Sequence, residues 1–467
     1  MNEDMMTESE RTSTLTDPTL GATTGRGKGV FYVHTLGCQM NVHDSERIAG
    51  VLEDDGYMPA TEEQAADKDV DLIIMNTCAV RENAAERMYG TIGLWADLKR
   101  THPNMQIAIG GCMAQLDRKR IAQKAPWVDA VFGTKNIGSL PRLLDQARMA
   151  GTCQVEVADK LDYFPSQLPV ARASKVSSWV SISIGCNNTC TFCIVPTTRG
   201  KEHDRRPGDI LAEIRRCVDE GAKEVTLLGQ NVNSYGKDLG TGYDFADLLT
   251  DLDKIEGDYL LRFMSSQPKD ASHKLFDVMA ASRHVAKQLH LPVQSGCDRV
   301  LRAMNRPYDV AKYLDLITYA RRVMPELVLT SDVIIGFPGE TESEAMETVA
   351  LVEKVRFDAL FTFIFSPRPG TPAAKMDDPV PREEKQRWFD RLCAVQNGIS
   401  EELHRQYVGQ TLRCLVDGES DDARWPLTAR TAGGRLVHCT GDRAALGEYR
   451  DVKITDSNTW ALFGTIE

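Results

Sequence analysis

Apolar runs alternate with amphipathic stretches in the first third of the chain. The runs "GVFYVHTLGC", "DLIIMNTC" and "MQIAIGGC" are rich in β-forming residues and end at Cys38, Cys78 and Cys112. Helical patterns follow them, at residues 43–54, 82–100 and 115–124. Such alternation is typical of a parallel sheet with helices between its strands. We therefore predict an open parallel-sheet domain over residues 29–146.

Each of these three cysteines stands just beyond the carboxyl end of a predicted strand. They are 40 and 34 residues apart, close to the length of one strand–helix–strand repeat. The carboxyl edge of an open α/β sheet is where ligands bind. The sequence therefore predicts three thiols that converge at one edge.

The same alternation returns after a connector at residues 147–172, which is rich in Pro, Ser and charge. Within residues 173–404, further strands are expected at residues 179–184, 223–228, 259–265, 287–293, 327–335 and 358–365. Six such units predict a partial (β/α)6 barrel with its chemistry at the carboxyl ends of the strands. Residues 381–409 have the pattern of a long amphipathic helix. Residues 405–467, with short β-prone runs broken by Gly and Asp, predict a small antiparallel β-barrel.

Composition narrows the class of protein. Residues 1–28 begin acidic, lack an apolar signal core and are rich in Ser and Thr, so we expect a disordered tail and no signal peptide. No apolar run reaches the roughly 20 residues of a membrane span. Twelve cysteines without a secretory signal favour a cytoplasmic protein whose clustered thiols serve metals or redox chemistry. The net charge of −12 does not by itself indicate a nucleic-acid partner.

The stretch "CNNTCTFC" places Cys186, Cys190 and Cys193 at the spacing C-x3-C-x2-C, after the first predicted barrel strand. Zinc sites made only of protein take four ligands, although a catalytic zinc leaves one position to water. In a 4Fe–4S cluster each iron takes one outer ligand, so three cysteines leave one iron open. The spacing favours a cluster that a substrate or cofactor completes.

This triplet, together with "LLGQNVNSYG" and "SDVIIGFPGET", resembles the radical S-adenosylmethionine superfamily. The resemblance implies that the open iron binds S-adenosylmethionine, which the cluster cleaves to a radical. It also implies cofactor contacts, at Phe192, Gln230, Asn231, Asp332 and Gly336.

A second set of motifs, "TLGCQMN", "NTCAVRENAAER" and "GGCMAQ", resembles the amino-terminal domain of methylthiotransferases. By that resemblance Cys38, Cys78 and Cys112 hold a second 4Fe–4S cluster, which supplies or carries the inserted sulfur. The last barrel resembles a TRAM domain, a small RNA-binding module. No catalytic residue beyond the cluster ligands is assigned.

Within this family, the motifs match the branch that modifies N6-dimethylallyladenosine beside the tRNA anticodon. The resemblance implies an enzyme that takes tRNA, an electron donor and a source of sulfur or clusters as partners, and we expect it to act as a monomer. Thr197 and Cys297 depart from the branch pattern. Two rivals stay open: the same chemistry on a ribosomal protein, and a non-catalytic iron–sulfur or zinc protein that binds RNA.

Five arginines are candidates for RNA phosphate contacts: Arg199, Arg205 and Arg206 after the cysteine loop, and Arg430 and Arg435 in the last barrel. For the first group a solvated strand edge is an equal alternative, since Glu202 and Asp204 dilute its charge. Residues 403–467 hold eight basic and nine acidic side chains, so RNA binding there rests on resemblance. Packing roles are expected for five further cysteines and three histidines, namely Cys153, Cys217, Cys393, Cys414, Cys439, His34, His43 and His290. Cys297 follows a predicted barrel strand at the active edge, and a packing or pocket-wall role is expected for it.

Overall fold

The computed structural model describes residues 27–79, 84–160, 164–166 and 168–467. Most of the predicted tail, and Val80–Asn83 of the "NTCAVRENA" run, lie outside these ranges. The chain forms two compact units. The first unit comprises residues up to 175 together with 183–188 and 194–205. The second unit comprises 176–182, 189–193 and 206–467.

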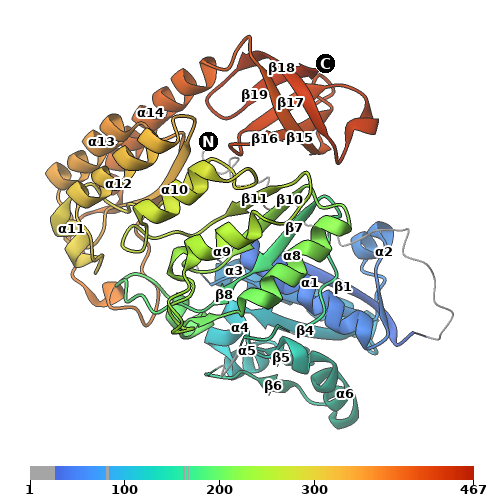
Figure 1. Cartoon of the computed structure of the whole chain (residues 1–467). Coiled ribbons are helices and arrows are strands. Elements are labelled where there is room, and N and C mark those ends of the chain that lie inside the picture. Colours follow the sequence, from blue (N-terminus) through green and yellow to red (C-terminus); the bar gives the residue numbers. More distant parts are fainter. Residues whose placement is uncertain (1–26, 80–83, 161–163, 167) are drawn as a thin grey trace. The chain divides into compact units, whose positions relative to one another are not determined.

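The first unit is built on a six-stranded sheet in which every pairing is parallel. Its order is β2-β1-β3-β4-β5-β6, and Figure 1 shows these strands in blue and teal. The strands are β1 Gly29–Leu36, β2 Tyr57–Pro59, β3 Leu72–Thr77, β4 Gln106–Gly111, β5 Ala130–Phe132 and β6 Gln154–Glu156. The predicted parallel sheet is confirmed. The strands that the sequence did not predict, β2, β5 and β6, have three residues each, too few to show a period.

Helices cover both faces of this sheet. Ile73 and Met75 pack in one apolar cluster with side chains of α3 and α5, whereas Leu72 and Ile74 pack in another with side chains of α1 and α6. A strand buried on both faces reads as a continuous apolar run, which explains "LIIM". The helices of this unit are α1 Gln39–Asp54, α2 Glu62–Asp67, α3 Ala84–Thr101, α4 Cys112–Asp117, α5 Lys119–Lys124, α6 Leu140–Ala150 and α7 Val195–Arg199.

The second unit contains six parallel strands at the predicted places. They are β7 Ser177–Ser181, β10 Glu224–Leu228, β11 Leu260–Phe263, β12 Gln288–His290, β13 Val328–Ile335 and β14 Ala359–Ile364. They pair as two three-stranded sheets, β11-β10-β7 and β12-β13-β14, and an isolated parallel bridge between Leu261 and Val285 links β11 to the residues before β12. The run at residues 179–184 is divided, because β7 ends at Ser181. Its last residues form β8 Ser183–Ile184, which pairs with β9 His203–Asp204 in the first unit.

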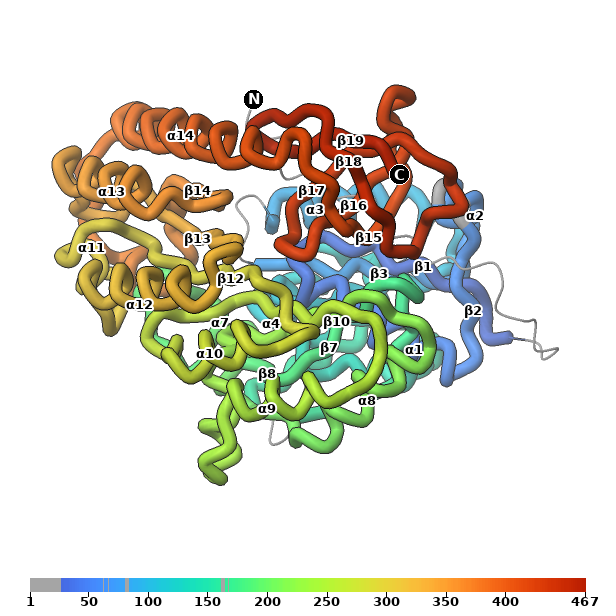
Figure 2. The backbone as a smooth tube through the Cα atoms, turned by 45° about the horizontal axis from the view of Figure 1, so that its top comes forward, coloured from blue at the N-terminus to red at the C-terminus, as the bar shows by residue number. Residues whose placement is uncertain are grey.

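Helices line the outside of these sheets. α8 packs on α9, α9 on α10, α10 on α12, and α13 on α14, as Figures 1 and 2 show. The helices are α8 Pro207–Asp219, α9 Phe245–Leu252, α10 His273–Ala281, α11 Asp298–Ala303, α12 Val310–Val323, α13 Glu342–Val355 and α14 Arg382–Arg405. Short 3-10 turns occur at Ile137–Ser139, Val232–Ser234, Ala373–Lys375 and Arg443–Ala445. Among the helices of the described residues, none is both long and apolar enough to cross a membrane.

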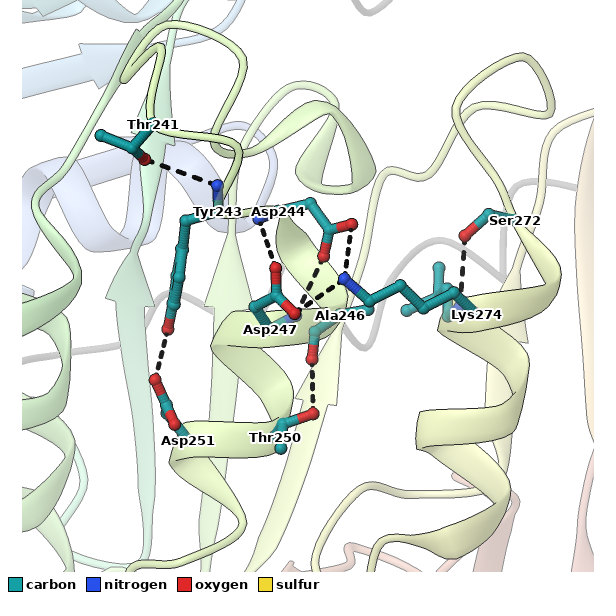
Figure 3. A network of polar contacts seen from close by, with 10 residues as sticks. Thr241, Tyr243, Asp244, Ala246, Asp247, Thr250, Asp251, Ser272 and Lys274 are labelled. Carbon is teal, nitrogen blue, oxygen red and sulfur yellow. Dashed lines mark hydrogen bonds and ion pairs between the residues drawn. The ribbon is translucent and has the colours of Figure 1, made fainter.

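A polar network fixes α9 against α10 (Figure 3). Asp244 caps α9 by accepting from the backbone N–H of Asp247 at 3.0 Å, and the Asp247 carboxylate accepts from the backbone N–H of Asp244 at 3.0 Å. Lys274 of α10 reaches both carboxylates, at 2.9 and 2.7 Å. The hydroxyl of Tyr243 donates to Asp251 at 2.8 Å. Reciprocal capping satisfies backbone donors at a helix start, and here it also supplies an anchor for the next helix.

The chain ends in a closed five-stranded barrel of order β15-β16-β17-β19-β18. Its strands are β15 Thr411–Glu419, β16 Leu427–Thr431, β17 Leu436–Thr440, β18 Tyr449–Ser457 and β19 Leu462–Ile466. The pairings are antiparallel except for β17 with β19, which is parallel. Arg262 of β11 ties the barrel to the sheet, because its guanidinium donates to the carbonyls of Thr431 at 2.9 Å and Ala432 at 2.8 Å.

Candidate functional site

The three cysteines of the first unit follow three neighbouring strands. In the sheet register Leu36 of β1 pairs with Thr77 of β3, and Thr77 pairs with Gly111 of β4. Cys78 and Cys112 come directly after these positions, and Cys38 comes two residues after Leu36. The register therefore brings all three cysteines to the same edge of the sheet.

This edge lies at a topological switch point. The helix after β1, α1, covers one face of the sheet, whereas the helix after β3, α3, covers the other. β1 and β3 are neighbours, so the chain leaves them toward opposite faces. Such a point opens a crevice outside the carboxyl ends of the strands, where ligands bind in open α/β sheets.

The surroundings of the cysteine sulfurs favour thiolate at one of them. A hydrogen bond with Cys78, assisted by the positive charge of Arg199, lowers the pKa of Cys38 to about 6. Burial raises the pKa of Cys112, and Arg199 opposes that rise. The thiolate is the form that binds metals. One thiol of the set is thus prepared as a ligand, and a guanidinium beside the set balances negative charge.

Buried amides hold the loop of Cys38 in place. The side-chain oxygen of Asn41 accepts from the Cys38 backbone N–H at 3.4 Å and from its thiol at 3.5 Å. Asn76 of β3 donates to the Asn41 carbonyl at 2.8 Å and to the Ser45 hydroxyl at 2.9 Å. Gly111 has φ +89°, and a Cβ there would lie 2.4 Å from the Asn76 oxygen. Glycine is therefore required just before Cys112.

Arg199 enters this site from α7, which packs on α4. Its side chain is 6% exposed and forms an ion pair of 2.7 Å with Asp44. Arg205 is also buried, with its guanidinium 5.5 Å from the ring centre of Phe164 and Nε donating to Ser166 at 3.3 Å. These positions fit neither the phosphate contact nor the solvated strand edge that the sequence suggested. The local charge pattern "RGKEHDRRP" cannot reveal an ion pair with a residue far away in the chain.

The donor set of this edge fits an iron–sulfur cluster. Each iron of a cluster takes its own outer ligand, so the thiols need to surround a volume rather than meet at one point. Within the part of the chain that the structure describes, no three His, Cys, Asp or Glu side chains are arranged to hold a single metal ion. Three thiols at one edge of the sheet, with a buried cation beside them, are suited to an anionic cluster.

The cysteines of the second triplet are divided between the two units. Cys186 belongs to the first unit, where its sulfur accepts from the side-chain amide of Asn188 at 3.2 Å. Cys190 and Cys193 belong to the second unit, where the Cys193 N–H donates to the Cys190 carbonyl at 3.1 Å. Gln267 approaches the Cys190 sulfur at 3.9 Å. Convergence of these three thiols stays a prediction from their spacing.

Buried polar atoms without partners lie after β10 and β11. Both polar side-chain atoms of Gln230, together with the side-chain oxygens of Asn231, Ser266 and Gln267, have no hydrogen-bond partner among the described residues. Asn231 does donate to Asp270 at 2.7 Å. Because buried polar groups are rarely left unpaired, this group fits a polar ligand such as S-adenosylmethionine. Gln230 and Asn231 are cofactor contacts that the sequence predicted, and that role stays a prediction. The sequence did not single out Ser266 and Gln267, although both follow a barrel strand.

The other predicted cofactor residues surround the end of β13. Asp332 lies within the strand, and Gly336 follows it with φ +71°. Glu340 accepts from the N–H groups of Gly336 and Phe337, at 2.5 and 3.0 Å, and burial raises the pKa of Glu340 to about 7. The ring of Phe192 lies 6.5 Å from that of Phe337. These positions do not test whether the residues contact a cofactor, so their cofactor-binding roles stay predictions.

The remaining arginine candidates differ in exposure. Arg206 is exposed at the start of α8. Arg430 is 42% exposed and pairs with Asp417 at 2.8 Å. Arg435 is 9% exposed and pairs with Asp358, which leaves little of it for an RNA phosphate. Arg206 and Arg430 therefore remain the better placed candidates.

The cysteines outside the two triplets take packing positions. Burial raises the pKa of Cys414 to about 12 and that of Cys439 to about 11, so both are uncharged thiols inside the last barrel. Cys297 is buried beside Val300 and Met304. Thr197, the other departure from the branch pattern, is exposed. Neither departure alters a predicted cluster ligand.

Family profiles divide the chain into three parts. The profile described as "Uncharacterized protein family UPF0004" matches residues 30–133. The profile of the Radical SAM superfamily matches residues 180–352, and that of the TRAM domain matches residues 405–466.

Relatives resemble the chain over almost its full length. A tRNA-2-methylthio-N(6)-dimethylallyladenosine synthase of Bifidobacterium adolescentis is 63% identical over 437 residues, which cover 93% of this chain and 91% of the relative. One of Saccharopolyspora erythraea is 50% identical over 423 residues, 90% of this chain and 85% of the relative. Among solved structures, the radical S-adenosylmethionine methyltransferase TsrM of Kitasatospora setae is similar with a TM-score of 0.52 and 13% identity, covering 85% of this chain and 79% of that one. That likeness shows the fold alone.

Proposed function

The chain belongs to the family of tRNA-2-methylthio-N(6)-dimethylallyladenosine synthases, and we propose that it adds a methylthio group to N6-dimethylallyladenosine in tRNA. The target is carbon 2 of the adenosine beside the anticodon. Sequence-selective RNA proteins mostly act on unpaired bases of this kind. Such a reaction needs radical chemistry and RNA binding. The radical SAM region would supply the first and the TRAM region the second.

One observation carries the proposal. Strands β1, β3 and β4 end in register, and a cysteine follows the end of each. A radical enzyme that holds one cluster on its three-cysteine loop would not need three further cysteines at the edge of another sheet. The edge supports a second cluster and thus a reaction that inserts sulfur.

Roles for the residues follow from their positions. Cys186, Cys190 and Cys193 hold the cluster that binds S-adenosylmethionine, and Cys38, Cys78 and Cys112 hold the other. When bound, the cofactor and the two clusters supply the radical, the methyl group and the sulfur. Other residues of the chain bind and orient these groups. Gln230 and Asn231 offer buried donors and acceptors to the cofactor, and Arg199 keeps a positive charge beside the second cluster.

Other partners follow from the chemistry. A reductant has to deliver electrons to a low-potential cluster, and a sulfur or cluster-assembly source has to replace the sulfur that leaves with each product. The last barrel and the exposed guanidinium of Arg206 would contact tRNA. We propose that the enzyme acts as a monomer.

The experiment is mass spectrometry of nucleosides from tRNA of a strain that lacks this protein. We expect the 2-methylthio derivative to disappear and N6-dimethylallyladenosine to accumulate. The wild-type chain should restore the product, whereas a chain with Cys38, Cys78 and Cys112 changed to Ala should not. Unchanged tRNA in the deletion strain, with a loss of methylthio groups from a ribosomal protein, would support the rival branch instead. Unchanged tRNA and ribosomal protein would support a non-catalytic RNA-binding protein.

A further inference from the structure

The inner face of β12, β13 and β14 carries an aromatic surface next to a polar pair. His290 pairs in register with Thr330, Asp332 with Phe361, and Ile334 with Phe363. Successive residues of a strand point to opposite faces of the sheet. Since neighbours in register share a face, these six side chains form one surface, which we call the inner face.

The opposite face of the same strands is occupied by helices and core. Leu289, Leu329 and Val333 are fully buried in the main apolar cluster of the second unit. Thr362, which stands between Phe361 and Phe363, contacts Cys393 of α14 with 3.4 Å between Oγ1 and Sγ. Phe361 and Phe363 therefore point away from α14.

The side chains of the two phenylalanines are exposed to solvent to a large extent for residues of their size. Phe361 is 45% exposed and Phe363 is 41% exposed. Both belong to β14, which is the edge strand of its sheet among the described residues. Two aromatic side chains on the inner face of an edge strand form an apolar wall that is still partly exposed to solvent.

Polar groups border this wall at a defined place. The His290 ring packs edge-on to Phe361, with 5.7 Å between ring centres and 77° between planes. Its two nitrogens lie 3.0 Å from the Thr330 hydroxyl and 3.5 Å from the Asp332 carboxylate. These contacts fix the imidazole, so the surface combines an apolar wall with oriented hydrogen-bonding groups.

We propose that Phe361 and Phe363 bind the dimethylallyl group of the target adenosine and that His290 and Asp332 border the base. This inference rests on the proposed function and names the part of the chain that selects its substrate. The occupant has matching chemistry, because a branched five-carbon group is apolar while the purine is planar with polar edges. The inner face of a β/α barrel near the carboxyl ends is where substrates react.

The test measures binding of two anticodon stem-loop RNAs to the reconstituted holoenzyme. The RNAs are identical except that one carries the dimethylallyl group. We expect the wild type to bind the prenylated RNA more tightly than the unmodified one. In the double variant Phe361→Ala, Phe363→Ala the ratio of the two affinities should fall by roughly 10- to 200-fold, because a hydrophobic pocket discriminates by about this factor for one methylene group. Affinity for the unmodified RNA should stay the same. Phe361→Leu should retain part of the preference, because it keeps apolar area but not the ring face.

Leu94→Ala is the matched control, since Leu94 is 72% exposed on α3 and lies outside the inner face. It should leave both affinities unchanged. An unaltered preference in the double variant, or equal weakening on both RNAs, would overturn this inference and leave the proposed function standing. A wild type that binds both RNAs equally would overturn the inference and also the proposed substrate.

Discussion

Arg199 and Asp44 form an ion pair inside the first unit, with 2.7 Å between Nη2 and Oδ2, and their side chains are 6% and 5% exposed. The same guanidinium lowers the pKa of the Cys112 thiol, against the larger effect of burial, which raises it. The pair thus joins residues 194–205 to the cysteine edge of the sheet. Because a charge so far from water is costly without its partner, each of the two residues depends on the other.

Changing Arg199 to Gln should therefore destabilise the first unit by about 3–5 kcal/mol, the usual loss when one member of a buried pair is removed. Hydrogen exchange of the amides in β1, β3 and β4 measures this locally. The double variant Arg199→Gln, Asp44→Asn should recover part of the loss, as a double-mutant cycle would reveal. Arg206→Gln, at an exposed position, is the control. If Arg199→Gln costs no more than the control, the pair does not stabilise the edge.

The two sets of cysteines should each hold one cluster. After anaerobic reconstitution we expect about eight irons per chain, as two clusters of four irons require. Changing Cys186, Cys190 and Cys193 to Ala should leave about half, and changing Cys38, Cys78 and Cys112 should leave the other half. Iron and sulfide analysis checks both variants. Four irons in the wild type, or tightly bound zinc, would contradict the account of the sites.

Glu340 should make the second unit less stable as pH rises. Burial raises its folded-state pKa from 4.5 to about 7, so the native state binds the proton more tightly than the unfolded state does. The resulting stability is complete below the unfolded pKa of 4.5 and is lost as pH rises through about 7. Between about pH 5 and pH 8, the wild type should lose roughly 1–3 kcal/mol relative to Glu340→Gln.

Hydrogen exchange in β13 across that pH range is the measurement. Gln retains an oxygen that accepts from the N–H groups of Gly336 and Phe337, so the variant keeps the loop contact and loses only the titration. Parallel pH profiles for the two proteins would show that Glu340 does not titrate in this window.

Arg206 should contribute to tRNA binding through charge alone. Neutralising one true phosphate contact weakens binding to all tRNAs alike and reduces the slope of log affinity against log salt by about 1. Arg206→Gln should have this effect. Arg100→Gln, at a side chain that is 78% exposed on α3, should not. An unchanged salt slope for Arg206→Gln would remove Arg206 from the RNA interface.

How much the sequence could predict differs from site to site. The strands that lead to Cys38, Cys78 and Cys112 were predictable, because burial on both faces gives unbroken apolar runs and each run ends in its cysteine. Their convergence followed from parallel topology. The weak strand β6 could not be found in this way, since a three-residue strand has no usable period.

Tertiary contacts explain what the sequence could not reveal. Arg199 and Asp44 are far apart in the chain, so their pairing left no local pattern, and the basic run around Arg199 suggested a surface instead. The run "ALFTFIF" is apolar at nearly every position. It predicted a strand correctly but did not indicate which of its side chains are exposed to solvent. Only the folded sheet shows that Phe361 and Phe363 form an exposed surface.

The most direct test of the central claim is anaerobic turnover of the reconstituted enzyme on tRNA with and without the dimethylallyl group, followed by nucleoside mass spectrometry. We predict the 2-methylthio product on the prenylated tRNA and little on the other. The variant without Cys38, Cys78 and Cys112 should still cleave S-adenosylmethionine but attach no sulfur. Equal product on both tRNAs, or sulfur insertion by that variant, would contradict the account.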